Sequence, residues 1–60
     1  MKLNIGSWVL VDGLYDYKII HIDDSKIILE EYDFMTVISN PCKLQIPKKD
    51  AYLFITDIIE

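Results

Sequence analysis

The sequence contains no arginine, and it has a single cysteine among its 60 residues. Arginine is the residue best suited to gripping phosphates and stacking on bases, so its absence, together with a net charge of −4, argues against nucleic acid as a partner. One cysteine, Cys42, cannot form an internal disulfide, which favours a reducing compartment. We therefore expect a cytoplasmic protein that does not bind nucleic acid.

The sequence also lacks a long hydrophobic run. The apolar residues after Lys2 are interrupted by Asn4, Gly6 and Ser7, which argues against a signal peptide. No run approaches the roughly 20 apolar residues that a membrane-spanning helix requires. We therefore expect no membrane contact.

Residues that carry catalysis or bind metals are few. His21 and Cys42 occur once each without the spacing of a nucleophile and its base, so we interpret them as packed side chains. The acidic pairs at 23–24 and 30–31 lack the spacing of a calcium loop and are interpreted as solvated. A domain of this size has little room for a catalytic pocket of about 300 Å³ or more. We expect a protein that is not an enzyme and holds neither cofactor nor metal.

Strand-forming residues dominate what is present. The hydrophobic class makes up 52% of the chain, with eleven isoleucines and four tyrosines against one alanine, a composition that favours strands. Residues 1–60 form one small domain, which cannot hide so many apolar side chains. Some of them must face outward, and a cluster of them would mark an interface.

The stretch from Gly6 to Asp24 predicts a β-hairpin around which the rest of the chain is arranged. Two extended runs, 7–11 and 15–22, are joined by Asp12-Gly13, a dipeptide typical of a chain reversal. A bulge near His21 would allow Ile19 and Ile22 to point to the same side of the second strand.

Further short strands are expected along the rest of the chain. A tight turn or short helix at 56–59 would then return Ile58 to the core. A helix over 25–35 is the competing interpretation, because Ile28, Tyr32 and Met35 have helical spacing. The predicted strands cover residues 26–32, 34–39, 44–46 and 52–55.

Five to six short strands with closely spaced turns predict a small barrel. The order Gly-x-Trp-Val-x-Val at 6–11, then Tyr-x-Ile at 17–19, then Ile22, Ile27 and Leu29, resembles small SH3-like barrel proteins. The likeness is greatest to short uncharacterised ones from bacterial and phage genomes, and it covers residues 5–31. It implies an all-β SH3-like barrel of five to six strands, the alternative being an α+β fold with a helix near 25–35. Because such barrels serve as adaptors and nucleic-acid binders alike, the resemblance implies no single function.

A second, shorter resemblance lies in Gly13-Leu14-Tyr15-Asp16-Tyr17. It is similar to the Ala-Leu-Tyr-Asp-Tyr motif of true SH3 domains, whose tyrosines line a groove for proline-rich peptides. Here the motif follows a strand and comes after the tryptophan, and the Pro-Ser-Asn-Tyr segment of that groove is absent. We interpret it as part of an aromatic hairpin.

The alternation within these strands predicts which residues face the core. The expected core is Val9, Val11, Ile19, Ile22, Ile27, Leu29, Leu53 and Ile58. The opposite faces would carry Trp8, Leu10, Ile20 and Ile28, with Tyr15, Tyr17 and Phe54 near the edges. Such a patch is rarely left bare by a soluble monomer, so we expect a protein partner, an oligomer, or both. The alternative is that a loop or residues 58–59 fold over this face.

Acidic residues are concentrated between positions 12 and 33, where seven carboxylates face two lysines. Three of these acids would form a rim around the apolar-aromatic patch. The predicted partner-binding residues are therefore Trp8, Leu10, Tyr15, Tyr17, Ile20, Ile28, Asp23, Asp24 and Glu30.

These features together predict a small non-catalytic protein-interaction module, encoded by a phage or mobile element, that binds a host or defence protein in the host-cell cytoplasm. In a sharper version its carboxylates imitate nucleic-acid phosphates and inhibit a basic partner. The alternatives are a structural subunit of a larger assembly such as a virion, and a small-ligand binder formed between copies of an oligomer.

Overall fold

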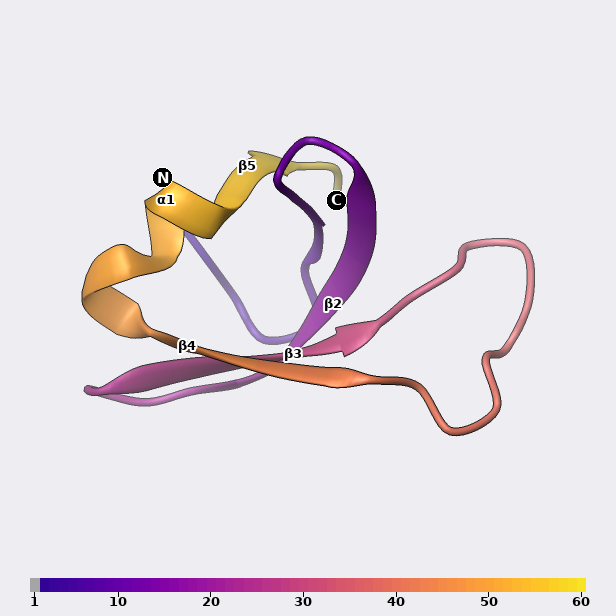
Figure 1. Cartoon of the computed structure of the whole chain (residues 1–60), viewed down its shortest axis with the longest axis horizontal. Helices are drawn as coiled ribbons and strands as arrows, with labels where there is room; N and C mark the ends of the chain where they lie inside the picture. The colour runs from indigo at the N-terminus through magenta and orange to yellow at the C-terminus, as the bar shows by residue number, and fades with distance from the viewer. Residues whose placement is uncertain (1) are drawn as a thin grey trace.

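The computed structural model describes residues 2–60, and its main element is a five-stranded antiparallel sheet (Figure 1). The chain meanders through four strands and then brings the fifth back beside the first, giving the order β4-β3-β2-β1-β5. A short 3-10 turn and one turn of α-helix connect the last two strands. The elements are β1 (Trp8–Val11), β2 (Tyr15–Ile22), β3 (Lys26–Glu31), β4 (Lys43–Pro47), η1 (Lys48–Asp50), α1 (Ala51–Phe54) and β5 (Ile55–Ile58).

The hairpin predicted between the first two strands is confirmed. Asp12 and Gly13 both have positive φ, 55° and 70°, the combination that suits the right-handed twist of a hairpin. The Leu14 N–H donates to the Val11 carbonyl at 3.1 Å, and Val11 then pairs with Tyr15. The polar dipeptide thus sets the register of β1 against β2.

The bulge expected near His21 is also present. The pairing of β2 with β3 slips between Ile19, opposite Leu29, and His21, opposite Ile28, so Ile20 is the extra residue. Ile19 is fully buried as a result, and Ile22 is half-buried against the core.

Residues 26–31 form β3, which pairs with both β2 and β4, so the strand was the right interpretation and the helix over 25–35 was wrong. The strand predicted at 34–39 was wrong. Glu30 pairs directly with Lys43, so β3 passes to β4 with that segment left out of the ladder between them. It belongs instead to a loop, residues 32–42, in which the Asp33 side chain accepts from the Met35 N–H at 2.9 Å and Asn40 has a left-handed φ of 53°. In Figure 1 this loop extends from the right-hand end of the molecule.

The end of the chain reverses the predicted order of its elements. Residues 52–54 of the strand predicted at 52–55 are helical, and 56–58, where a turn or short helix was expected, continue a strand that begins at Ile55. Ala51 and Ile55 lie four residues apart, so one helical turn places both toward the core and turns Leu53 outward, 69% exposed. Ile55 then pairs with Val11, which extends the sheet.

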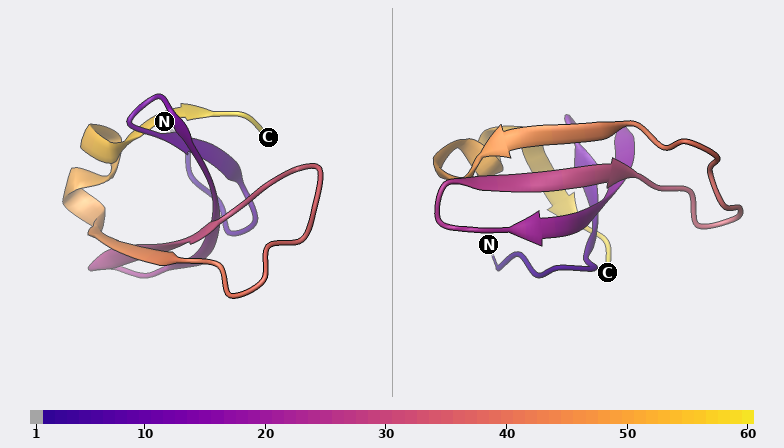
Figure 2. Two further views of the ribbon diagram at one scale, coloured as in Figure 1. Left: turned by 45° about the vertical axis from the view of Figure 1, so that its right-hand side comes forward. Right: turned by 90° about the horizontal axis from the view of Figure 1, so that it is seen from below.

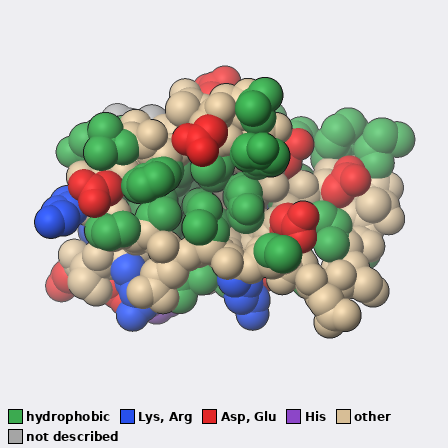
Figure 3. Space-filling model, viewed as in Figure 1, with side chains coloured by type: hydrophobic (Ala, Val, Ile, Leu, Met, Phe, Trp, Pro, Cys, Tyr) green, Lys and Arg blue, Asp and Glu red, His purple; other side chains and the backbone are tan. Residues whose placement is uncertain are grey.

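The sheet curves round its core without closing, since β4 and β5 are the two ends of the strand order. Figure 2 shows this curvature, with η1 and α1 spanning the open side. On the face in Figure 3, hydrophobic side chains gather in the middle, between the α1–β5 region above and β4 below. Within residues 2–60 no helix is long and apolar enough to cross a membrane.

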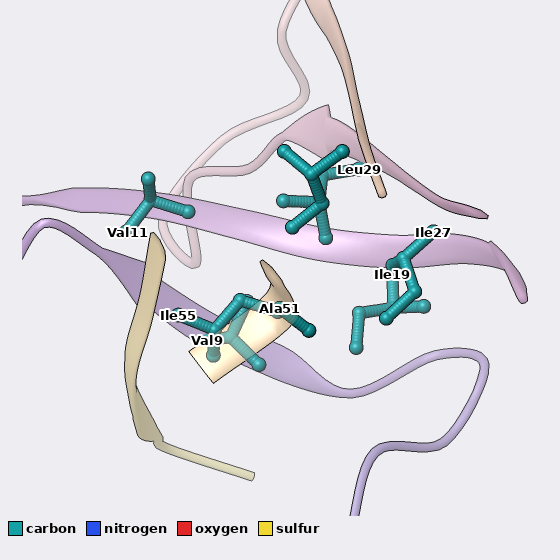
Figure 4. Packing of buried hydrophobic residues seen from close by; sticks show 8 residues of the cluster. Val9, Val11, Ile19, Ile27, Leu29, Ala51 and Ile55 are labelled. Carbon is teal, nitrogen blue, oxygen red and sulfur yellow. The ribbon is translucent and has the colours of Figure 1, made fainter. Parts of the chain in front are cut away.

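The core lies inside this curve (Figure 4). Ile22 and Ile58 of the predicted core are half-buried against it, whereas Leu53 is exposed, so its assignment to the core was wrong. Ile46, Ala51 and Ile55 are buried but were not predicted to be. The strand at 44–46 was predicted without saying which of its residues face the core, and the elements at 51–55 were predicted wrongly. The buried set is Val9, Val11, Ile19, Ile27, Leu29, Ile46, Ala51 and Ile55.

Candidate binding site: an aromatic cleft with an acidic rim

The outer face of the sheet divides the residues that we predicted to form one patch. Trp8 pairs with Lys18, and Lys18 pairs with Glu30, so this row of the sheet is mostly charged. Ile28 lies in another row, opposite His21, and the bulged Ile20 lies beside it at 36% exposure. Trp8 therefore belongs to a different group of side chains from the two isoleucines.

Trp8 is held by the start of the 32–42 loop. Its indole N–H donates to Asp16 Oδ1 at 2.9 Å, and its ring packs edge-on against Tyr32, with centroids 5.4 Å apart. Phe34 stacks on the same indole at 5.5 Å, and Lys18 Nζ lies 4.2 Å from the centroid of the Tyr32 ring. The alternative in which a loop covers part of this face thus applies to Trp8, which is half-buried.

A cleft of about 360 Å³, more room than the sequence led us to expect in so small a domain, opens where this loop meets the end of the β1–β2 hairpin. The two sides are fastened together by the backbone, because the Tyr32 N–H donates to the Asp16 carbonyl at 3.1 Å and Tyr17 pairs with Glu31. Tyr15 and Tyr17, both predicted site residues, line it. The full lining is Leu14, Tyr15, Asp16, Tyr17, Glu31, Tyr32, Asp33, Phe34 and Ile38.

Three carboxylates, Asp16, Glu31 and Asp33, lie in that lining. Each is oriented through one oxygen: Asp16 by the Trp8 indole, Glu31 by the Cys42 N–H at 2.9 Å, and Asp33 by the Met35 N–H. Within residues 2–60 the ion pairs both involve Asp23, so none of the three cleft carboxylates is in a salt bridge. The cleft therefore joins aromatic surface to negative charge without an ion-paired lysine.

The other predicted acids lie elsewhere. Asp23 and Asp24 occupy the turn between β2 and β3, so the length of β3 separates them from Glu30. Asp23 Oδ1 accepts from the Ser25 N–H at 2.8 Å and from the Lys26 N–H at 2.9 Å, while Oδ2 lies 3.0 Å from His21 Nε2. The backbone hydrogen bond from Ser25, followed by the contact with His21, holds the pKa of Asp23 well below its usual range. This carboxylate organises a turn.

Two further expectations are corrected. His21 and Cys42, interpreted from the sequence as packed side chains, are both exposed. Leu10 is half-buried and is paired with Asp16 on one side and Asp57 on the other, away from Ile20 and Ile28. Within residues 2–60, no three His, Cys, Asp or Glu side chains are grouped as a metal site would require.

On the hairpin side of the cleft, Tyr15 and Tyr17 were predicted from the alternation of the second strand, and Leu14 and Asp16 were missed. The signal that could have found them is the short motif at 13–17, four of whose five residues line the cleft. The loop side was missed, because the predicted strands at 26–32 and 34–39 left no loop here; its residues are Tyr32, Asp33, Phe34 and Ile38. Comparison of the chain with protein-family models, with curated proteins and with solved structures finds no match.

Proposed function

We propose that this protein is a small non-catalytic interaction module that binds a protein partner through the cleft between the β1–β2 hairpin and the 32–42 loop. The observation that carries the proposal is the combination, in one cleft of about 360 Å³, of four aromatic rings and three carboxylates outside any salt bridge. Aromatic rings are favoured as interface anchors because they bury a large area while few torsions become fixed.

The charge of the cleft specifies the chemistry of the partner. Carboxylates and ring faces both attract cations, the rings through their quadrupole. The molecule already holds one ammonium group in this way, since Lys18 Nζ lies 4.2 Å from the centroid of Tyr32. The partner segment that fits is therefore basic, with lysine or arginine beside apolar side chains.

This proposal refines the acidic-rim hypothesis. The acids that act are Asp16, Glu31 and Asp33 rather than Asp23, Asp24 and Glu30. The net charge of −4 and the basic chemistry of the partner support the sharper version, an inhibitor carried by a phage or mobile element that occupies a basic host or defence protein in the cytoplasm. The strand order and the curvature of the sheet support its assignment as a partly open SH3-like barrel.

Site-specific photo-crosslinking tests the proposal. A photoreactive phenylalanine analogue is placed at Tyr15 or at Ile38, on the two sides of the cleft, and as a control at Lys49 on η1. Each variant is irradiated in lysate of cells that carry the gene, and the adducts are identified by mass spectrometry. We expect both cleft positions to capture the same basic protein and position 49 not to capture it. Equal capture from position 49, or different proteins from the two cleft positions, would contradict the proposal.

A second candidate, a subunit of a larger assembly, is favoured by a separate observation. The 32–42 loop exposes Phe34, Met35 and Val37 to 64%, 79% and 95%, although all three are apolar. Side chains so exposed are suited to a contact with another molecule.

A further inference from the structure

One end of the molecule carries an apolar tip. Met35 and Val37, at 79% and 95% exposure, lie in the 32–42 loop, which extends from the right-hand end of the molecule in Figure 1. Hydrophobic side chains gather at this same end in Figure 3. Phe34, by contrast, is stacked on Trp8 and serves the loop itself. Met35 and Val37 therefore form the free part of the loop, which we call the tip.

The other end carries an apolar hollow of about 200 Å³, where β2 ends, β3 begins and α1 passes over them. Ile27 and Ala51, 1% and 2% exposed, belong to both the hollow and the core, and Tyr52 stands at the edge at 68% exposure. In Figure 1, η1 and α1 lie at the left, away from the loop. The hollow is lined by Leu3, Ile22, Ile27, Lys48, Ala51 and Tyr52.

A molecule cannot place its own tip in its own hollow. The two lie at opposite ends of a body whose longest extent is 30 Å, and the loop is anchored at both ends by β3 and β4. The tip of a second copy would come from outside, and its entry into the hollow would remove Met35 and Val37 from water and cover the core residues there.

The charges beside the tip and the hollow are complementary. Glu31, at the end of β3, and Asp33, in the loop, precede the tip, whereas Lys48 lines the hollow and Lys49 follows Lys48. In a contact between two copies, carboxylates beside the tip would approach ammonium groups beside the hollow. Opposite charges at the margin of an apolar contact favour one orientation of the two molecules.

We infer that copies of this chain associate head to tail, with Met35 and Val37 of one copy seated in the hollow of the next. This goes beyond the proposed function, since its apolar contact uses none of the aromatic residues of the cleft, although Glu31 and Asp33 lie beside both contacts. The contact is heterologous, so each copy keeps a free tip and a free hollow, and association continues into chains or closes into rings. Because a single loop makes the contact, the association is weak and depends on protein concentration.

Sedimentation velocity on two variants and their mixture tests the inference. The tip variant is Val37→Asp, at a fully exposed position that should not affect folding, and the hollow variant is Tyr52→Glu. The average molecular mass of the parent in solution should increase as its concentration is raised from about 10 μM to about 1 mM, and each variant alone should remain monomeric. An equimolar mixture should form a dimer and stop there, because the tip variant retains a hollow and the hollow variant retains a tip.

Controls separate loss of the contact from loss of the fold. Leu53→Ser changes an exposed residue of α1 that does not line the hollow, and should leave association unchanged. Should Tyr52→Glu unfold by circular dichroism, Lys48→Glu takes its place as the hollow variant. A parent that stays monomeric throughout the range, or a mixture that stays monomeric while the parent associates, overturns the inference.

Discussion

At the scale of single residues, burial separates side chains that look alike in the sequence. Leu29 and Leu53 were both expected in the core, but they are 0% and 69% exposed. Leu29→Ala should lower the free energy of unfolding by about 2–4 kcal/mol because it leaves a cavity, whereas the matched change Leu53→Ala should stay within about 0.5 kcal/mol. Urea denaturation of the two variants measures the difference, and equal effects would show that the helical turn is wrongly oriented.

Asp23 gives a residue-scale prediction about pH. Its folded pKa is depressed by the hydrogen bonds within its turn, so its contribution to stability is present above the unfolded pKa, about 4, and is lost as pH falls through the folded value. Asp23→Asn should therefore be less stable than the parent at pH 7, and the two should converge as the pH is lowered below about 4. Urea titrations at a series of pH values test this. A difference that stays constant down to pH 2 would mean that the charge of Asp23 plays no part in the turn.

The same contacts show that Asp23 is a poor residue for testing a binding surface. Reversing its charge together with those of Asp24 and Glu30 would be the direct test of the acidic rim predicted from the sequence. Because Asp23 accepts the N–H groups of Ser25 and Lys26, that substitution would disturb the β2–β3 turn itself.

At the scale of elements, the turn at 12–13 sets the register of the first hairpin. Gly13→Ala should cost about 1 kcal/mol, because a side chain is strained at a φ of 70°. Space is not the cause, since the added methyl would lie 3.9 Å from Thr56 Oγ1. Asp12→Asn is the control: asparagine tolerates left-handed backbone, so thermal unfolding should be unchanged. An alanine variant as stable as the parent would contradict the turn geometry.

The strands at 7–31 and at 44–46 were predictable, whereas the loop at 32–42 and the elements after position 50 were not, for a physical reason. From position 7 to 31, the Asp12-Gly13 turn between two apolar runs and the alternation within 26–31 specify strands locally, and β2 has the bounds expected. The apolar runs at 34–39 and 52–55 are too short to distinguish strand from helix by periodicity. Their structure depends on contacts with the rest of the sheet. Ile55, for example, is in a strand because it pairs with Val11 of β1.

The residues of the candidate site divide in the same way into those that could be predicted from the sequence and those that could not. Tyr15 and Tyr17 lie on a strand, so their place on one side of the hairpin could be predicted. Asp33 and Ile38 reach the cleft through the path of a loop that is fixed by side-chain contacts, among them the stacking of Phe34 on Trp8. The periodicity of hydrophobic residues in the sequence does not predict the path of such a loop.

At the scale of the whole molecule, the two ends have different surfaces. The end with the 12–14 turn and the 32–42 loop carries the aromatic cleft and its carboxylates, while the end with η1 carries the apolar hollow and Lys48. The core lies between these two ends, inside the curve of the sheet. A 60-residue chain thus has room for two contacts, one with a basic partner and one with another copy of itself, and the residues they share are the carboxylates Glu31 and Asp33.

The central claim is that the cleft binds a basic protein segment, and its most direct measurement is the affinity of the crosslinked partner for a charge variant of the cleft. Glu31→Gln combined with Asp33→Asn removes two charges but keeps the oxygens that accept from Cys42 and Met35. Asp24→Asn, at the far end of β3, is the matched control. By calorimetry at about 0.1 M salt, the double variant should bind at least about fivefold more weakly than the parent, the control should match the parent, and the gap should narrow as salt is raised toward about 1 M. Equal affinities for the parent and the double variant would contradict the claim.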